Sequence, residues 1–345
     1  MAKIGVLTGG GDCPGLNAVI RGIVVRACIL GHEVLGLRRG YRGLMDGGRT
    51  MELSAEDVED IHVSGGTILG SSMLDPYQEK NGEKQVIKNY KRLGLDCLIV
   101  VGGEMSLRAA AKLSAKGVNV IAVPKTLDNN VAMTDYTFGF ATASNVACEA
   151  IERLQTSAQS RERIVVVEVI GLHSGWTALY SGLGAGASYV AIPEFPFDLK
   201  EICELIQYRR TQGKPYSIIV VAEGAQPNSV SQQQSLAKLA EKHGEVDMGH
   251  GVAAWLAQQI KRKLKVETQS VILGHVQRGG IPTAFDRVLG MRLGAMAADL
   301  AEEGKFGLMT ALRGARVESV DIMEAAKTRK LVDCEFYEEI KTFFS

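Results

Sequence analysis

The sequence of 345 residues has no excess of charge of either sign, because 39 lysines and arginines balance 39 aspartates and glutamates. This balance gives no overall field that would attract nucleic acid or an acidic membrane surface, so neither is expected as a partner. Long apolar runs are also lacking: no stretch approaches the roughly 18 residues of a membrane span. The apolar run near the start is shorter than the core of a secretory signal. A soluble, cytoplasmic protein is expected.

Cysteines are few and scattered. The six of them form no Cys-x-x-Cys pair and have no regular spacing, which argues against a zinc site or a disulfide framework and favours reduced thiols. A hydrophobic fraction of 46% excludes a disordered chain. With about 150 residues per domain, the length suits two domains, each large enough to bury a core.

Glycine, by contrast, is abundant, and short β-branched runs alternate with longer helical patterns. This alternation predicts two α/β units whose mostly parallel sheets are covered by helices on both faces. The expected strands are residues 4–8, 33–37, 97–101, 120–123, 164–169, 189–192, 217–222 and 270–273. The expected helices are 16–31, 106–116, 141–160, 176–183, 198–212, 252–265 and 283–303. The helix at 283–303 completes the regular pattern, and one more helix is expected in the polar stretch 226–249.

Glycine-rich segments follow the predicted strands, and ligands of open α/β sheets bind at such carboxyl ends. Residues 9–15, Gly-Gly-Gly-Asp-Cys-Pro-Gly, join the first strand to the first helix. Backbone N–H groups and a helix N-terminus can hold an anion there. The segment matches neither the dinucleotide-binding nor the Walker motif. A plain strand-to-helix turn is the alternative interpretation.

A second glycine pair is followed by a carboxylate, in Val-Gly-Gly-Glu-Met-Ser at residues 101–106. Mg²⁺ needs only one or two protein carboxylates when phosphates and water complete its coordination shell. Glu104 is therefore a candidate metal ligand. Alternatively, Glu104 is simply a first-turn residue that the helix dipole favours.

A third segment, Pro-Lys-Thr-Leu-Asp-Asn-Asn at residues 124–130, follows another buried strand. Asp128 could accept the proton of a hydroxyl that is being phosphorylated. Lys125 could neutralise phosphate as a point charge. A polar turn without chemistry is the alternative.

Less specific signals lie further along the chain. A glycine-bounded turn spans residues 65–72, and residues 171–176 and 222–225 end strands of the second unit. Residues 274–280, which include His275 and Arg278, could present an imidazole and a guanidinium to a sugar or a phosphate. A single histidine is more often a structural hydrogen-bonding residue than a catalyst.

Taken together, these segments resemble the phosphofructokinase family, and in particular its bacterial pyrophosphate-dependent branch. The matching segments occur in family order and cover nearly the whole chain: residues 8–18, 65–72, 124–129, 138–143, 222–225 and 274–280 with 282–287.

The resemblance implies two similar three-layer α/β/α domains with the active site in the cleft between them. The phosphate-donor domain would comprise residues 1–139 and 277–327, and the sugar domain residues 140–276 and 328–345. The reaction would move a phosphoryl group from pyrophosphate, or less readily ATP, to the C1 hydroxyl of fructose 6-phosphate.

The resemblance also assigns roles to residues. Donor phosphates would lie against Gly11, Gly103 and Lys125 with Mg²⁺ at Glu104, and Asp128 would remove the hydroxyl proton. The acceptor would be held by Thr126, Glu223, His275 and Arg278, while Arg163 would reach a neighbouring active site in a homodimer or homotetramer.

The donor markers of the family disagree here. Lysine at position 125 accompanies pyrophosphate use in the family, whereas glycine accompanies ATP use. At position 105 the family has Gly in ATP users and Asp in pyrophosphate users, and Met105 is neither.

Five positions depart from the family pattern: Met73, Met105, Asn130, Leu172 and Gln269. At positions 73, 172 and 269 the family usually has an arginine. Three hypotheses follow: an ordinary pyrophosphate-dependent phosphofructokinase, a relative that phosphorylates another sugar or polyol, and a non-catalytic subunit that regulates an active paralogue in a mixed assembly.

Overall fold

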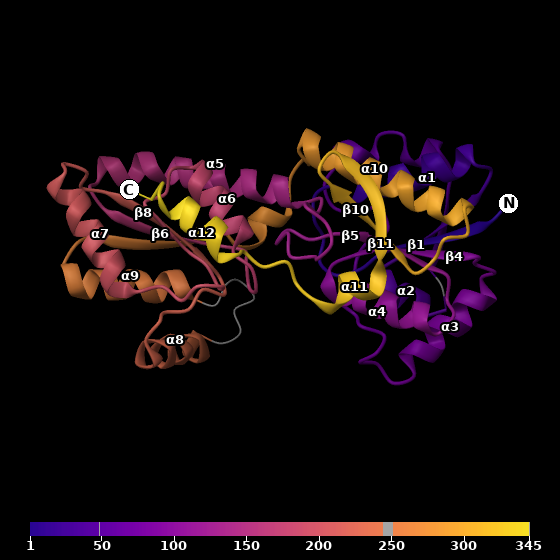
Figure 1. The fold of residues 1–345 in the computed structure, drawn as a ribbon, viewed down its shortest axis with the longest axis horizontal. Coiled ribbons are helices and arrows are strands. Elements are labelled where there is room, and N and C mark those ends of the chain that lie inside the picture. The colour runs from indigo at the N-terminus through magenta and orange to yellow at the C-terminus, as the bar shows by residue number, and fades with distance from the viewer. Residues whose placement is uncertain (48, 244–250, 345) are drawn as a thin grey trace. The chain divides into compact units, whose positions relative to one another are not determined.

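The computed structural model describes residues 1–47, 49–243 and 251–344, with residues 239–243 described by their backbone alone. The chain divides into two compact units: unit 1 is Met1–Thr142 with Arg278–Lys330, and unit 2 is Ala143–Gln277 with Leu331–Ser345 (Figure 1). The sequence analysis places the crossings after residues 139, 276 and 327; in the structure they follow residues 142, 277 and 330.

Unit 1 contains a seven-stranded sheet in the order β11-β10-β5-β4-β1-β2-β3. The five inner strands run parallel to one another, and each edge strand, β3 or β11, is antiparallel to the inner strand beside it. The strands are β1 (Lys3–Thr8), β2 (Glu33–Leu37), β3 (Thr50–Leu53), β4 (Cys97–Gly102), β5 (Val120–Pro124), β10 (Leu308–Arg313) and β11 (Arg316–Asp321).

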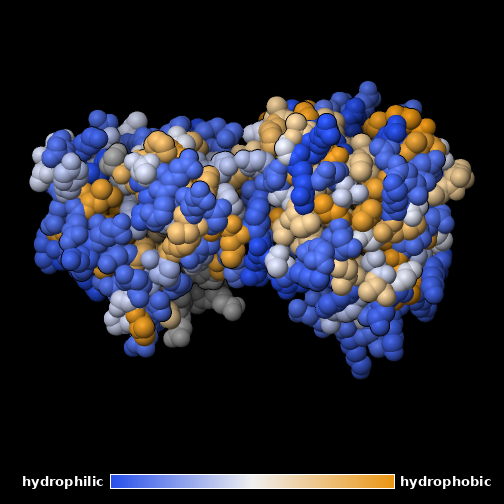
Figure 2. Space-filling view, viewed as in Figure 1, coloured by the Kyte–Doolittle hydropathy of each residue, from blue (hydrophilic) through white to orange (hydrophobic). Residues whose placement is uncertain are grey.

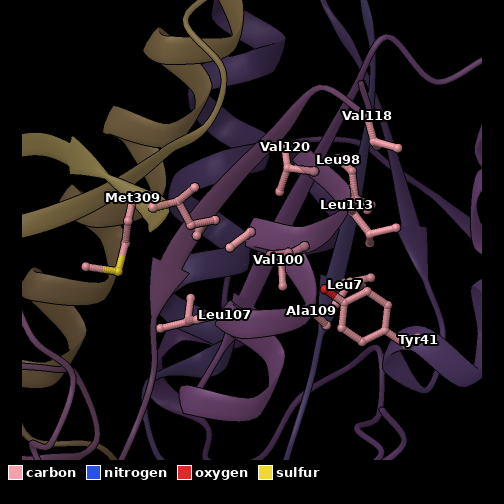
Figure 3. Close-up of a cluster of buried hydrophobic side chains, with 14 of the residues drawn as sticks. Leu7, Tyr41, Leu98, Val100, Leu107, Ala109, Leu113, Val118, Val120 and Met309 are labelled. Carbon is pink, nitrogen blue, oxygen red and sulfur yellow. The ribbon is translucent and has the colours of Figure 1, made fainter. Parts of the chain in front are cut away.

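Helices and short turns surround this sheet. They are α1 (Leu16–Ile29), α2 (Gly40–Met45), η1 (Glu56–Val58), η2 (Ile61–Val63), α3 (Gly82–Arg92), α4 (Glu104–Ala115), α10 (Ala284–Glu302) and α11 (Ile322–Lys327). Figure 3 shows how α2 and α4 cover one face: Leu107 and Leu113 of α4 and Tyr41 of α2 pack with Val100 and Val120 of the central strands. Each of these side chains is at most 1% exposed.

Unit 2 has a four-stranded parallel sheet in the order β7-β8-β6-β9. Its strands are β6 (Ile164–Val169), β7 (Tyr189–Ala191), β8 (Ser217–Ala222) and β9 (Thr268–Ile272). Its helices are α5 (Phe140–Ser160), which begins in unit 1, α6 (Trp176–Gly184), α7 (Leu199–Thr211), α8 (Val230–His243), α9 (Val252–Leu264) and α12 (Cys334–Lys341), with the turn η3 (Gly274–Arg278).

The strands of unit 2 are buried on both faces. Alternate residues of β6 join different clusters: Val165 and Val167 pack with α5, α6 and α12, whereas Ile164 and Val166 pack with α7 and α9. This arrangement explains the near-continuous apolar runs in the sequence, because neither face of the sheet is left to solvent.

The predicted α/β fold with mostly parallel sheets is confirmed by the strand pairing of both units. The prediction that the regular pattern ends at residue 303 is wrong, since β10, β11, α11 and α12 follow. The elements α2, β3 and α3 were also missed. The edge strands β3 and β11 are only partly buried, so they lack the apolar runs by which inner strands are identified. The helix expected in residues 226–249 is α8, and residues 244–249 lie outside the described part.

In Figure 2 polar residues dominate the visible face of unit 2, whereas the visible face of unit 1 is a mixture of polar and apolar groups. Among the described residues, none of the helices combines the length and the apolar composition that a bilayer crossing requires.

Helices α1 and α10 pack unusually close in unit 1 because glycines stand at their contact. A Cβ atom on Gly22 would lie 2.3 Å from the carbonyl oxygen of Met291, and one on Gly294 would lie 2.4 Å from that of Val19. Both distances are far below van der Waals contact, so each position requires glycine for steric reasons.

Replacing Gly22 with alanine is expected to lower the melting temperature of the protein. The steric cost, about 1–3 kcal/mol, exceeds the gain of roughly 0.5–1 kcal/mol that alanine brings inside a helix. Gly279→Ala is the control, because no atom lies within 4 Å of its Cβ position. Thermal unfolding followed by circular dichroism measures both variants. An unchanged melting temperature for Gly22→Ala would contradict the close packing.

Candidate functional site

Three loops of unit 1 meet because three parallel strands end at the same level. Thr8 of β1 is in register with Val101 of β4, and Gly102 of β4 is in register with Pro124 of β5. The loops that begin at Gly9, Gly103 and Lys125 therefore lie side by side. Their backbone hydrogen bonds continue the pairing, from Gly9 N to Val101 O (2.8 Å) and from Lys125 N to Gly102 O (2.9 Å).

These loops enclose a hollow of about 160 Å³ in unit 1. Seven of the ten predicted site residues line it: Gly11, Gly103, Glu104, Lys125, Thr126, Asp128 and Arg278. The other lining residues are Gly10, Asp12, Cys13, Met73, Met105, Ser106 and Leu127. The structure thus brings the predicted donor residues together around one space.

Glycine is favoured at two positions of this lining. Gly10 has a φ of 81°, in the left-handed region, and a Cβ there would lie 3.1 Å from Lys125 Nζ. A Cβ on Gly103 would lie 3.0 Å from the carbonyl oxygen of Lys125. Side chains at either position would crowd Lys125 and narrow the hollow.

Lys125 is the buried cation of the site, only 5% exposed. Its ammonium donates a hydrogen bond to the carbonyl oxygen of Gly11. Burial lowers the pKa of Lys125, the Arg278 guanidinium adds to that shift, and the Asp12 and Asp128 carboxylates oppose it only in part. The pKa of the Cys13 thiol is raised to about 12, again chiefly by burial, so Cys13 lies beside the ammonium as a neutral thiol at pH 7. A charged, desolvated ammonium of this kind binds an anion strongly.

The segment that carries Asp128 is held by its own side chains. Thr126 Oγ1 accepts a hydrogen bond from the Asp128 N–H at 3.0 Å. Asn129 is 2% exposed, has a φ of 50°, and accepts a hydrogen bond from the Thr137 N–H at 3.0 Å. Asn130 is buried, and its carbonyl oxygen accepts from the Lys330 N–H at 2.9 Å. These contacts fix the backbone on both sides of the Asp128 carboxyl.

Glu104 lies in the first turn of α4, and both of its carboxylate oxygens are ion-paired. Oε1 pairs with Arg108 of the same helix, and Oε2 lies 2.6 Å from Arg329 Nε. The described residues hold no group of three or more histidines, cysteines or acids arranged around a metal. The carboxylates of Asp12, Glu104 and Asp128 nonetheless line one hollow, and oxygen ligands of this kind fit Mg²⁺ when substrate phosphates supply the rest.

Arg278 lies beside the donor loop in this structure, although the resemblance assigns it to the acceptor. Its guanidinium is 3.5 Å from the carbonyl oxygen of Asp12, and a Cβ on Gly11 would approach it to 2.9 Å. The hollow therefore has a second cation beside Lys125.

The other predicted acceptor residues belong to unit 2. Glu223 follows β8, and its carboxylate accepts from the Gly171 N–H at 3.4 Å. His275 is exposed in η3, a turn that the buried Gln277 fastens to the end of β6 through the Ile170 N–H. Arg163 is 5% exposed and lies 3.6 Å from Glu267. Unlike an arginine that extends toward a neighbouring molecule, Arg163 is buried in its own chain.

The five departures from the family pattern occupy different surroundings. Met73 and Met105 line the hollow, and Met73 is 68% exposed. In unit 2, Leu172 is exposed after β6 and Gln269 is exposed on β9. The methionines thus bring apolar surface to the phosphate hollow itself.

Sequence reasoning missed Arg329 and Ser106. Arg329 pairs with Glu104 across 225 positions of sequence, a separation that leaves no local signal. Ser106 is 3% exposed and packs against Gly9 and Gly102. Its place two residues after a predicted metal ligand, in the same glycine segment, was the available clue.

Comparison with known proteins identifies relatives across the whole chain. The family model described as "Phosphofructokinase" matches residues 3–301. The pyrophosphate–fructose 6-phosphate 1-phosphotransferase of Amycolatopsis methanolica is 48% identical over 99% of both chains, and that of Dictyoglomus thermophilum is 46% identical over 99% of both. The ATP-dependent 6-phosphofructokinase 3 of Streptomyces coelicolor is 45% identical over 98% of both. Phosphofructokinase from Saccharomyces cerevisiae aligns with a TM-score of 0.82 at 29% identity, over 95% of this chain and 45% of that one.

Replacing Lys125 with methionine is expected to weaken pyrophosphate binding by roughly 10–100-fold, the worth of one charge-assisted hydrogen bond. The variant should also melt at a higher temperature at pH 7, because it removes a buried charge. Since the pKa of Lys125 is lowered in the folded state, the unfolded chain binds more protons and wild-type stability rises as the pH approaches 10.5. The difference in the free energy of unfolding between Lys125→Met and wild type should therefore narrow as the pH rises toward 10.5.

Calorimetric titration and thermal melts between pH 7 and 10 measure the two effects. The exposed Lys116→Met is the matched control and should show neither. Equal pyrophosphate affinity in Lys125→Met and wild type would show that Lys125 does not bind pyrophosphate.

Proposed function

Since the chain belongs to the phosphofructokinase family, we propose that it uses pyrophosphate and Mg²⁺ to phosphorylate the C1 hydroxyl of fructose 6-phosphate. The donor hollow of unit 1, with the buried ammonium of Lys125 in its lining, is the observation that carries this proposal.

The size of the hollow favours a small donor. Its volume of about 160 Å³ is below the roughly 300–1,000 Å³ of pockets for drug-sized ligands such as nucleotides. Lys125 contributes to this small volume, because its side chain lines the hollow and reaches across to Gly11. Relatives named for pyrophosphate and for ATP are almost equally similar to this chain, so the preference for pyrophosphate rests on Lys125 and on the space.

Each residue of the hollow has a task in this proposal. Lys125 and Arg278 neutralise the transferring phosphoryl group, and the N–H groups of the glycine loops bind its oxygens. Asp128 accepts the proton of the attacking hydroxyl. Glu104, Asp12 and Asp128 are the available ligands for Mg²⁺, which would neutralise charge that develops on the phosphate oxygens. For Glu104, metal binding requires exchange of its ion pairs with Arg108 and Arg329.

The acceptor assignment extends the proposal to unit 2. Glu223 and His275 would bind sugar hydroxyls, and Thr126 would contact the acceptor from the Asp128 segment. A role for Arg163 in a second active site of a homodimer or homotetramer would require it to leave Glu267. Arg163 can exchange this ion pair for one with a phosphate, because the Glu267 carboxylate is largely exposed and water can replace the arginine beside it.

Two observations favour a second candidate, a non-catalytic subunit that regulates an active paralogue. Two methionines line the phosphate hollow, and Glu104 is already neutralised by two guanidiniums. Both features weaken a donor and metal site. A mixed assembly with a paralogue would then give the chain a regulatory role.

A coupled assay with Mg²⁺ and fructose 6-phosphate should show turnover with pyrophosphate and a kcat/KM at least tenfold lower with ATP. The preference follows from Lys125 and the small hollow. An unphosphorylated polyol in place of the sugar phosphate should give no turnover; product from the polyol alone would instead establish a different acceptor. Absence of product with either donor, together with a changed rate of an added active paralogue, would support the regulatory subunit.

Asp128→Asn should reduce kcat by about 100-fold or more, because it removes the general base. The melting temperature should change by no more than about 2 °C, since a surface substitution of similar shape is usually within 0.5 kcal/mol of neutral. Asp46→Asn, at an exposed site away from the hollow, is the matched control. Retained activity with full pyrophosphate affinity would show that another group removes the proton.

A further inference from the structure

A second hollow in unit 1 is surrounded by arginines. It has a volume of about 440 Å³ and is lined by Arg38, Arg39, Arg49 and the segment 67–70. It shares no lining residue with the donor hollow. Its volume lies within the range of small-ligand sites.

The three guanidiniums have no carboxylate partner in the described part of the chain. None of the ion pairs there involves Arg38, Arg39 or Arg49, and no acidic residue lines this hollow. Three like charges around one space repel one another, and an anion at the centre would relieve that repulsion. Guanidinium groups bind phosphate with paired hydrogen bonds, which makes phosphate the best match.

The backbone holds these arginines in place. Arg38 donates its N–H to the carbonyl oxygen of Arg49 at 2.9 Å, which sets the two side by side at the ends of β2 and β3. Arg39 donates its N–H to Leu69 O at 2.8 Å, and its stem lies along Gly70. These bonds fix the points at which the three side chains leave the backbone at the hollow.

Arg39 also has a backbone conformation that is unfavourable for a residue with a side chain. Its φ of 62° lies in the left-handed region, where glycine would be relaxed. A strained residue whose side chain lines a charged hollow suggests that the side chain is kept for a function.

We propose that this hollow binds a small phosphorylated metabolite, through Arg38, Arg39 and Arg49, at a site separate from the donor hollow. The segment 67–70 connects the two places, because Thr8 Oγ1, at the base of the donor loop, donates to Gly70 O at 2.8 Å. Gly10 N donates to Ser72 O at 2.9 Å just beyond it. A ligand here contacts the segment that supports the donor loop, so it acts as an effector.

Arg39→Gly is the sharpest variant, since it removes a guanidinium and relieves the backbone at the same time. Its melting temperature should equal or exceed that of wild type, so lost binding could not be ascribed to misfolding. Inorganic phosphate is the probe, titrated by calorimetry into the full chain. Wild type should show two classes of site.

Arg39→Gly should weaken one class by roughly tenfold or more, as should the double variant Arg38→Gln with Arg49→Gln. Lys125→Met should weaken the other class. Arg316→Gln, which removes an exposed arginine elsewhere in unit 1, is the charge-matched control and should change neither. Identical isotherms for wild type and Arg39→Gly, or a single class of site in wild type that Lys125→Met abolishes, would overturn the proposal. If phosphate binds but shifts the donor KM equally in wild type and Arg39→Gly, the effector role is wrong.

Discussion

Parallel pairing of β1, β4 and β5 is the constraint on which the candidate site depends. Because Thr8, Val101 and Val123 are in register within one residue of the ends of their strands, three chain segments far apart in sequence leave the sheet at one edge. No contact among Gly11, Gly103 and Lys125 would exist without that register. Buried strands are a rigid support for such loops, since a slip of one residue would expose the apolar core. Because the glycines have no side chains, a phosphate can approach the backbone N–H groups of the loops closely.

The electrostatics of the hollow differ from those the sequence suggested. At positions 73, 172 and 269 the usual arginines of the family are absent, yet the structure gathers Lys125 and Arg278 at the hollow and Arg108 and Arg329 around Glu104. Burial makes the Lys125 charge costly in the free protein, and an anionic ligand would offset that cost. The site thus contains a buried cation as well as more exposed guanidiniums, and the buried cation contributes more per charge in a low-dielectric environment.

Sequence patterns were sufficient for most inner strands and most helices, because these elements are buried on defined faces and carry the matching periodicity. The inner strand β10 is the exception, since it follows the last predicted element. The patterns were also sufficient to bring six site residues together, since the ends of β1, β4 and β5 share one edge, whereas Arg278 reaches the hollow from η3. Three kinds of feature escaped. In edge strands such as β11, apolar and polar residues alternate only weakly. The pairing of Glu104 with Arg329 depends on tertiary contacts. The burial of Arg163 beside Glu267 follows from packing that leaves no local sequence pattern.

The discontinuity of unit 1 has a consequence for synthesis of the chain on the ribosome. Its sheet needs β10 and its helix α1 needs α10, yet both belong to Arg278–Lys330, and all of Ala143–Gln277 is translated first. At 5–20 residues per second, the first 142 residues wait roughly 10–40 s for their missing partners. During that interval β5 presents an unpaired strand edge, and the glycine face of α1 is uncovered. Nascent unit 1 is therefore the stage at which a chaperone would matter most, whereas unit 2 is nearly complete before β10 emerges.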